Sequence, residues 1–364
     1  MAFSRGRRAP HLAILVILAL ASVALGLPRV VLAGKNDLRL LNLCPSHSQS
    51  MGAMGGQVQE CSWIERNSAG QVTGVNVDAQ SQANFRSLMS ELGVVVAPRL
   101  QTPADTLGYA GFQFSGELGV TKISNTKPFW NGVAGVDPSN PNAIRPDSYL
   151  TTVGGFVRKG MWLPLPAFEL GAGAVTVLGS SMYALESYAK LALQEGFHGW
   201  ALPSLAVRGS VSQLLGTDQV DLTVYGIDVL ISKAFSLAGT ARVEPFGGWN
   251  ILFIDAKSGV IDATPSCDAL TGQSPVGTSL PSSYCTAATP AAPNDLNANF
   301  TFPNQDVITR QRWFGGIKLR LSVLFLVTEY DVVIAGRSSD GGGAKAQDAS
   351  GTQQSFSLSA GFDF

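Results

Sequence analysis

Ionised side chains in the middle of long, otherwise apolar stretches are the residues of this chain best placed to do chemistry. Arg310 and Arg312 are two positions apart, as are Arg242 and Glu244, so each pair would lie on one face of an extended strand. Facing a water-filled channel, such bases would favour the passage of anions. Alternatively, bases and acids pair and brace a filled interior. The residues concerned are the bases Arg208, Arg242, Arg310, Arg312, Lys318 and Arg320 and the acids Glu117, Glu169, Glu244, Glu329 and Asp331.

Histidine, the most common general base, is scarce. The chain has only His11, His47 and His198. His198 lies in a stretch with Gly196 and Gly199, where an ordinary turn is the simpler interpretation. A Ser–His–acid hydrolase needs a histidine within hydrogen-bond reach of a positioned serine. The sequence has no nucleophile elbow, P-loop or metalloprotease helix, so we predict that the protein is not an enzyme.

Ten extended stretches between Tyr109 and Phe364 would position the ionised residues. In 168–174, apolar residues alternate with Glu169, Gly171 and Gly173, the period of two typical of a strand with one apolar face. Many stretches exceed the ~5–6 residues usual in globular sheets and the ~9–11 residues with which a tilted strand crosses a bilayer. The stretches are 109–120, 149–162, 168–174, 183–194, 203–213, 219–232, 236–253, 310–321, 323–335 and 356–364.

The connections between these stretches differ in length in a regular way. If the chain runs up and down, every long connection falls on one side. Outer-membrane barrels show this asymmetry, whereas a Greek-key sandwich has no reason to sort its connections. One side receives 123–147, 179–182, 214–218, 256–307 and 337–352, and the other receives 163–166, 195–202, 233–235 and the break near Ser322.

The last nine residues, FSLSAGFDF, place Phe356, Leu358, Phe362 and Phe364 on one face of a strand. This stretch resembles the C-terminal insertion signal of bacterial outer-membrane β-barrel proteins, which end in an amphipathic strand whose final residue is usually Phe. The resemblance implies a barrel that is inserted into the outer membrane by the barrel-insertion machinery. The alternative is the edge strand of a soluble sandwich.

Composition agrees with a surface that faces lipid. Charged residues make up 14% of the chain and hydrophobic residues 45%, whereas soluble proteins carry about 25% charged residues. Basic residues cluster only in the first eight positions, so we predict no nucleic-acid partner.

The first 33 residues have the features of a secretory signal peptide. Arg5, Arg7 and Arg8 precede the uncharged apolar run 12–26, and Ala33 ends a short stretch suited to signal peptidase. The alternative is a retained membrane anchor, although Pro28 and Arg29 interrupt that run.

All four cysteines lie after the predicted signal peptide and would be present in the exported chain. Cys44 and Cys61 are close in the sequence, as are Cys267 and Cys285, which indicates two local disulfides. Three connectivities are open, and locality alone favours this one. None of the pairs has the spacing of zinc ligands, so we predict no metal and no cofactor.

Residues 34–108 do not have the alternation of barrel strands. Within them, Phe85, Leu88, Met89 and Leu92 recur at helical spacing and predict a short amphipathic helix over 78–92 that ends at Gly93. This region would lie in the periplasm or plug the barrel.

We therefore expect an all-β protein, a transmembrane antiparallel up-and-down barrel of about ten strands (eight to twelve) in the bacterial outer membrane. Its parts would be a signal peptide (1–33), a partly helical N-terminal region (34–108) and the barrel (109–364). We favour a passive pore or uptake barrel for a small-molecule solute. A closed-lumen barrel with a structural or surface-interaction role is the alternative, and a barrel-embedded hydrolase is less favoured. The expected partners are outer-membrane lipid and the insertion machinery.

Overall fold

The computed structural model describes residues 34–51, 56–68, 72–99, 101–136, 145–162, 167–196, 202–237, 241–263, 299–339 and 347–364. The predicted signal peptide lies outside these residues, as do His198, Cys267 and Cys285. Among the described residues, no helix is both long and apolar enough to cross a membrane.

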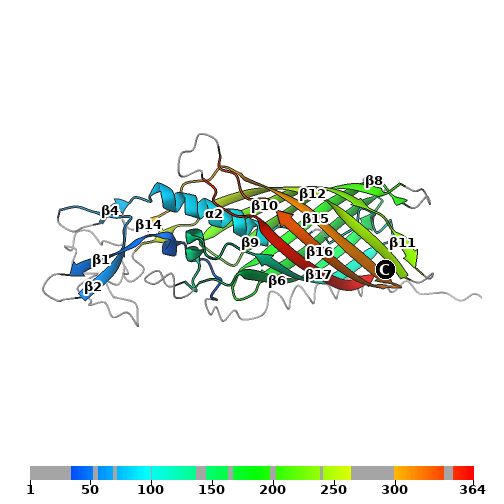
Figure 1. The fold of residues 1–364 in the computed structure, drawn as a ribbon, viewed down its shortest axis with the longest axis horizontal. Helices are drawn as coiled ribbons and strands as arrows, with labels where there is room; N and C mark the ends of the chain where they lie inside the picture. Colours follow the sequence, from blue (N-terminus) through cyan, green and yellow to red (C-terminus); the bar gives the residue numbers. More distant parts are fainter. Residues whose placement is uncertain are drawn as a thin grey trace, which may run out of the picture. The chain divides into compact units, whose positions relative to one another are not determined.

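An antiparallel sheet closed into a barrel contains most of the chain after residue 111 (Figure 1). In the described ranges it has ten strands that pair in sequence order, and the ring closes where β5 pairs with β17. The short β11 (Phe235–Leu237) extends the pairing of β12 at one end. The predicted barrel and strand number are confirmed. The strands are β5 (Phe112–Lys122), β6 (Tyr149–Met161), β7 (Phe168–Val177), β8 (Tyr183–Gln194), β9 (Ser204–Leu215), β10 (Val220–Ser232), β12 (Ala241–Ser258), β15 (Ile308–Leu321), β16 (Leu324–Val333) and β17 (Gln353–Asp363).

The barrel wall is apolar outside and polar inside. In β17, Phe356 is 51% exposed and the next residue, Ser357, is fully buried, as the alternation of a strand requires. A soluble protein would bury such a belt, so this outer face is suited to hydrocarbon. Other large apolar side chains exposed on the outside are Leu118 in β5, Leu185 in β8, Ile227 in β10 and both Trp313 and Ile317 in β15.

The two ends of the barrel differ in their connections. The three longest, 123–148, 259–307 and 334–352, all join strands at the same end, here called the long-connection end. The turns at the opposite, C-terminal end are shorter, and the tightest places Ser322 at a positive φ of 57°. The 259–307 connection contains the short pair β13 (Ile261–Asp262) and β14 (Asn299–Phe300), and 123–148 contains the 3₁₀ helix η3 (Pro128–Gly132).

The N-terminal region lies at the long-connection end. It consists of the 3₁₀ helix η1 (Leu40–Leu43), the hairpins β1 (Ser46–Met51)–β2 (Gly56–Cys61) and β3 (Ile64–Arg66)–β4 (Val72–Val75), and the helix α2 (Ala79–Val95). A disulfide joins Cys44 to Cys61, with their Cα atoms 5.7 Å apart.

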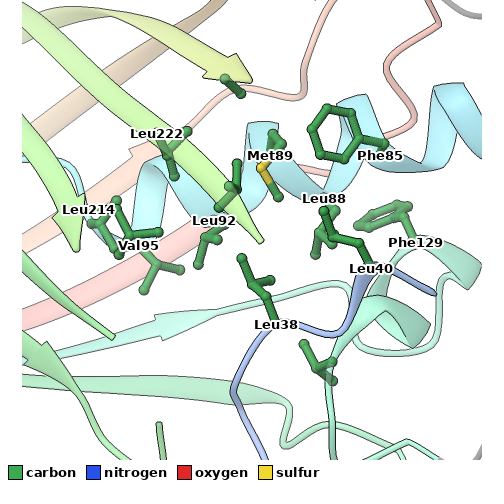
Figure 2. Packing of buried hydrophobic residues seen from close by; sticks show 14 of the residues in the cluster. Leu38, Leu40, Phe85, Leu88, Met89, Leu92, Val95, Phe129, Leu214 and Leu222 are labelled. Atoms are coloured by element: carbon green, nitrogen blue, oxygen red, sulfur yellow. The ribbon is translucent and has the colours of Figure 1, made fainter. Parts of the chain in front are cut away.

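Helix α2 closes the mouth of the barrel with an apolar core (Figure 2). Leu92 and Val95 near its C-terminus belong to one buried cluster with Leu214 of β9 and Leu222 of β10, which point inward from the wall. Burial of each such side chain contributes about 1.5–3 kcal/mol. The lumen is therefore apolar at this end and becomes polar further in.

The helix is longer than the sequence predicted. Gly93 does not end it, and the helix continues to Val95. A Cβ at position 93 would lie 2.7 Å from the side chain of Ile254 in β12. The glycine therefore serves close packing against the barrel wall, and tertiary contact outweighs its low helix propensity.

Asp78 caps the start of α2 and ties it to the hairpins. Its carboxylate accepts hydrogen bonds from the Ser81 N–H and from the Trp63 indole N–H, both at 2.8 Å. Burial raises the pKa of the Asp78 carboxyl, but these hydrogen bonds outweigh that effect and lower the pKa overall.

Candidate functional site: a filled barrel lumen

After α2 the chain runs through the interior of the barrel. Residues 96–107, here called the lumen segment, connect the helix at the long-connection end to β5, which begins at the C-terminal end. Residue 100 is not among the described residues. The contacts follow the segment in order from one end to the other. They are Ser212 Oγ to the Val96 carbonyl (2.7 Å), an Arg312 nitrogen to the Pro98 carbonyl (2.9 Å), the Gln101 N–H to Glu329 (2.6 Å), the Ala104 N–H to Ser232 Oγ (3.1 Å), the Thr106 N–H to Glu195 (2.9 Å) and the Leu107 N–H to Glu169 (3.0 Å).

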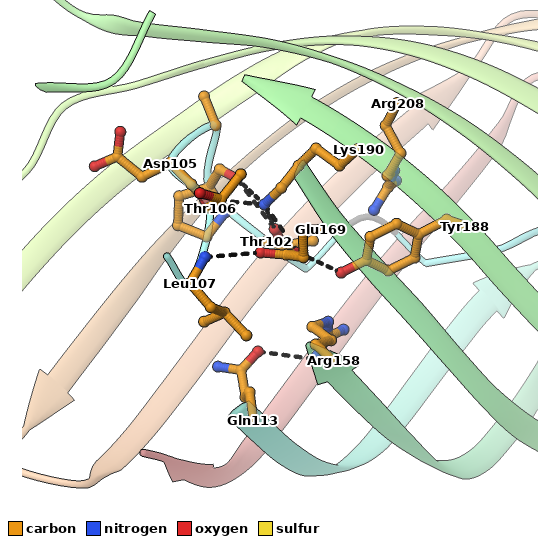
Figure 3. Close-up of polar contacts among 12 residues, drawn as sticks. Thr102, Asp105, Thr106, Leu107, Gln113, Arg158, Glu169, Tyr188, Lys190 and Arg208 are labelled. Carbon is orange, nitrogen blue, oxygen red and sulfur yellow. Dashed lines mark hydrogen bonds and ion pairs between the residues drawn. The ribbon is translucent and has the colours of Figure 1, made fainter. Parts of the chain in front are cut away.

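Lys190 of β8 is the densest point of attachment for this segment (Figure 3). Its ammonium donates to Thr102 Oγ1 at 2.8 Å and to the carbonyls of Pro103 and Asp105 at 3.0 and 2.9 Å. It also pairs at 3.1 Å with Glu169, and both side chains are 1% exposed. The carbonyl oxygens of the lumen segment compensate for the burial of the Lys190 ammonium. If the segment moved away, this charge would lose those acceptors.

Among the described residues, three lumen ion pairs join neighbouring strands of the wall. Arg208 of β9 lies 2.6 Å from Asp228 of β10, and Arg158 of β6 lies 2.8 Å from Glu117 of β5. These pairs line the wall, whereas the space between opposite walls is filled by the lumen segment.

Arg242 links the wall to the lumen segment near the C-terminal end. It pairs with Asp105 at 2.8 Å and more loosely with Glu244 of its own strand at 3.5 Å. Lys318 and Arg320 both face Asp363, at 3.1 and 3.6 Å.

Arg310 and Arg312 point inward as predicted from their spacing, but they bind neutral oxygens. Arg310 donates to the hydroxyls of Ser90 in α2 and Ser350 in the last long connection, both at 2.9 Å. It thereby fastens the helix to that connection. Arg312 holds the Pro98 carbonyl and contacts the amide oxygen of Asn250 at 3.2 Å.

The remaining predicted acids, Glu329 and Asp331, are buried side by side in phase on β16, and Glu329 receives the Gln101 N–H. The lumen-lining candidates predicted from the sequence leave out several inward-facing residues that form this interior. They are Arg99 in the lumen segment, Arg158, Glu186 and Lys190 in the wall, and the acidic partners Asp228 and Asp363. All of them except Arg99 lie in strands, in phase with neighbours that point inward, so the alternation alone identifies them as inward-facing.

A cavity of about 100 Å³ remains near the C-terminal end of the lumen. It has room for a few water molecules. Among the described residues, no group of three His, Cys, Asp or Glu could hold a metal ion. The cavity is lined by polar groups from the segment and the wall, including Thr102, Asp105, Gln113, Glu244, Lys318 and Asp363.

No protein-family model and no curated protein matches this chain. Similar solved structures include Ail, the attachment invasion locus protein of Yersinia pestis, at 9% identity, with 70% of this chain and 99% of that chain covered and a TM-score of 0.23. Neisserial surface protein A has 9% identity, 69% and 95% coverage and a TM-score of 0.25. The translocator domain of autotransporter NalP from Neisseria meningitidis has 11% identity, 79% and 99% coverage and a TM-score of 0.32. These are bacterial outer-membrane β-barrel proteins, but the fold of this chain rests on its strand pairing, and no function is transferred from them.

Proposed function

We propose that this protein is an integral β-barrel of the bacterial outer membrane whose lumen is closed, and that it presents residues 34–95 and the long connections for interaction at the cell surface. The lumen segment is the observation that carries this proposal. It occupies the barrel from the apolar mouth beneath α2 to the start of β5 and is hydrogen-bonded along its length.

Displacing the segment would be costly. Lys190 alone would lose three hydrogen bonds to the segment, and hydrogen bonds to charged groups contribute about 1.5–3 kcal/mol each. The apolar contacts of Leu92 and Val95 at the mouth would add to this cost. A closed scaffold therefore agrees better with the geometry than the passive pore favoured by the sequence, which stays a prediction.

The route to the membrane is part of the same proposal. An N-terminal signal peptide would export the chain, and the barrel-insertion machinery would recognise its last strand. Phe356, Leu358 and Phe362 lie on the outward side of β17, and the exposed Phe364 follows its last residue. The rings of Phe362 and Phe364 stack with centroids 6.1 Å apart. Outer-membrane lipid would then surround the apolar face.

Conductance measurements separate the closed scaffold from the pore. In planar bilayers, the full-length protein is expected to show no sustained open-state current because the lumen segment fills the barrel. A variant that lacks residues 34–107 serves as the positive control and is expected to conduct, since it lacks the segment that fills the barrel and keeps the ion pairs that join neighbouring strands of the wall. Sustained ohmic current through the wild-type protein would contradict the closed scaffold and restore the passive pore.

The orientation of the N-terminal region gives a second prediction. An epitope inserted after Ser68, between β3 and β4, is expected to bind antibody on intact cells of a Gram-negative host. The matched control is the same epitope inserted after Trp162, in a short connection at the C-terminal end, which is expected to bind only after permeabilisation. Staining of intact cells through the control position would show that the barrel is inverted relative to this proposal.

A further inference from the structure

A second cavity, of about 290 Å³, lies on the outside of the barrel wall at the long-connection end. Thr309 and Gln311 of β15 form its floor and alternate with the inward-facing Arg310 and Arg312. Helix α2 contributes Arg86, and the chain that follows β16 contributes the other side. The lining residues used below are Arg86, Val307, Thr309, Ile334, Arg337, Ser338 and Ser339.

Arg86 is buried in this cavity without a carboxylate partner. It is 2% exposed, and its one hydrogen bond runs from a terminal nitrogen to the Asp306 carbonyl at 2.9 Å. Its Nε has no hydrogen-bond partner. Among the described residues, no carboxylate oxygen lies within ion-pairing distance of either Arg86 or Arg337.

The nearest acids, Asp306 and Asp348, do not neutralise this guanidinium. Burial lowers the pKa of Arg86, and the more distant charges of Asp348 and Asp306 only partly oppose that effect. One oxygen of the Asp348 carboxylate accepts the Ser350 N–H at 2.9 Å, and the other is buried without a hydrogen-bond partner but lies beyond ion-pairing distance of Arg86. A buried charge without a partner is expensive, and a bound anion would remove that cost.

We infer that this cavity is an anion-binding site for a phosphate group, held between the guanidinium groups of Arg86 and Arg337. The planar fork of arginine matches the oxygens of a phosphate, and its hydrogen bonds to anions are stronger than those between neutral groups. Hydroxyl donors stand beside the two arginines. The Ser339 hydroxyl is buried and has no hydrogen-bond partner, and Thr309 and Ser338 also line the cavity.

The phosphate can come from a lipid headgroup or from solution. The rim of the cavity includes Val307 and Ile334, which are 53% and 40% exposed. Trp313, on the same face of β15, is the next outward residue beyond Gln311 and belongs to the apolar belt. A phosphate group bound in this cavity would lie at the edge of the apolar belt. The apolar side chains of the belt would lie on one side of it and the two arginines on the other.

The test measures binding of two probes to the full-length protein in detergent micelles by isothermal titration calorimetry. The probes are inorganic phosphate and dioctanoyl phosphatidic acid, a lipid with a phosphate monoester, and dioctanoylglycerol is the phosphate-free control. We expect saturable binding of at least one phosphate probe and none of dioctanoylglycerol. Arg337→Gln is expected to weaken this binding about tenfold or more, because it removes one charge-assisted contact. Binding of phosphatidic acid without binding of inorganic phosphate would identify a lipid headgroup site.

Two further variants keep the result interpretable. Arg86→Lys retains the charge but not the fork, and is expected to weaken binding as well. Arg39→Gln removes an exposed charge outside the cavity and is expected to leave binding unchanged. Equal affinity of the wild type and Arg337→Gln, equal loss in Arg39→Gln, or no saturable binding of either phosphate probe would overturn the site. Arg337 is exposed, so its replacement tests the proposal even if Arg86 variants fail to fold.

Discussion

Replacing Asp228 with Ala is expected to lower the free energy of unfolding by about 3–5 kcal/mol, because it leaves a buried guanidinium without its carboxylate. Asp228 lies 2.6 Å from Arg208, and neither side chain is exposed. The amide of Asn250 also contacts this carboxylate and would lose an acceptor. Urea unfolding in lipid vesicles, followed by tryptophan fluorescence and by the migration of unboiled samples in SDS gels, measures the change.

The matched control is Asp221→Ala, which removes an exposed carboxylate from the same strand and is expected to change stability by no more than about 0.5 kcal/mol. The double variant Arg208→Met/Asp228→Leu is expected to recover most of the loss, since it removes both charges together. A loss below about 1 kcal/mol in Asp228→Ala is what a solvated pair would give. That result would indicate a wet lumen and would favour the open pore.

The second large effect is expected on the outer face. Ile227→Arg places a charge near the middle of β10, on a side chain that is 48% exposed on the apolar belt. At the midplane of a bilayer such a substitution costs about 2–4 kcal/mol. The same unfolding measurement in vesicles gives the value.

A position nearer the end of β10, and so further from the membrane midplane, supplies the control for this prediction. Asp221→Arg lies on the same face of β10 but next to the long-connection end, where an arginine costs about 0–1 kcal/mol. A barrel that spans a membrane predicts a clear difference between the two positions. Equal and small effects at Ile227 and Asp221 would show that the apolar belt does not face hydrocarbon.

The barrel could be predicted because its signal is local. The alternation in 356–364 assigns each residue of β17 to one face without reference to any other strand, and the structure places Phe356 outside and Ser357 inside accordingly. Helix α2 was also visible from its spacing, but its end was not. Propensity alone predicts that Gly93 ends the helix, whereas its close packing against Ile254 involves a strand far away in the sequence.

The path of the lumen segment could not be predicted. Residues 96–107 have neither helical nor strand periodicity, and their partners, such as Lys190 and Glu329, are far away in the sequence. The pairing of Arg208 with Asp228 depends on the register between β9 and β10, which no single strand reveals. The alternation therefore predicts which residues face inward, whereas their partners follow only from the assembled wall.

A chain that passes through its own ring restricts the order in which the ring can be made. The lumen segment, a single extended stretch of chain, already fills the interior of the barrel. The folded hairpins and α2 at the long-connection end are wider than that stretch. They therefore cannot pass through the closed barrel while folded. Either β5 pairs with β17 after the lumen segment is in place, or residues 34–95 pass through the ring unfolded. In the second case the disulfide between Cys44 and Cys61 is expected to form only after residues 34–95 have passed through the ring, whereas in the first case it can form before β5 pairs with β17.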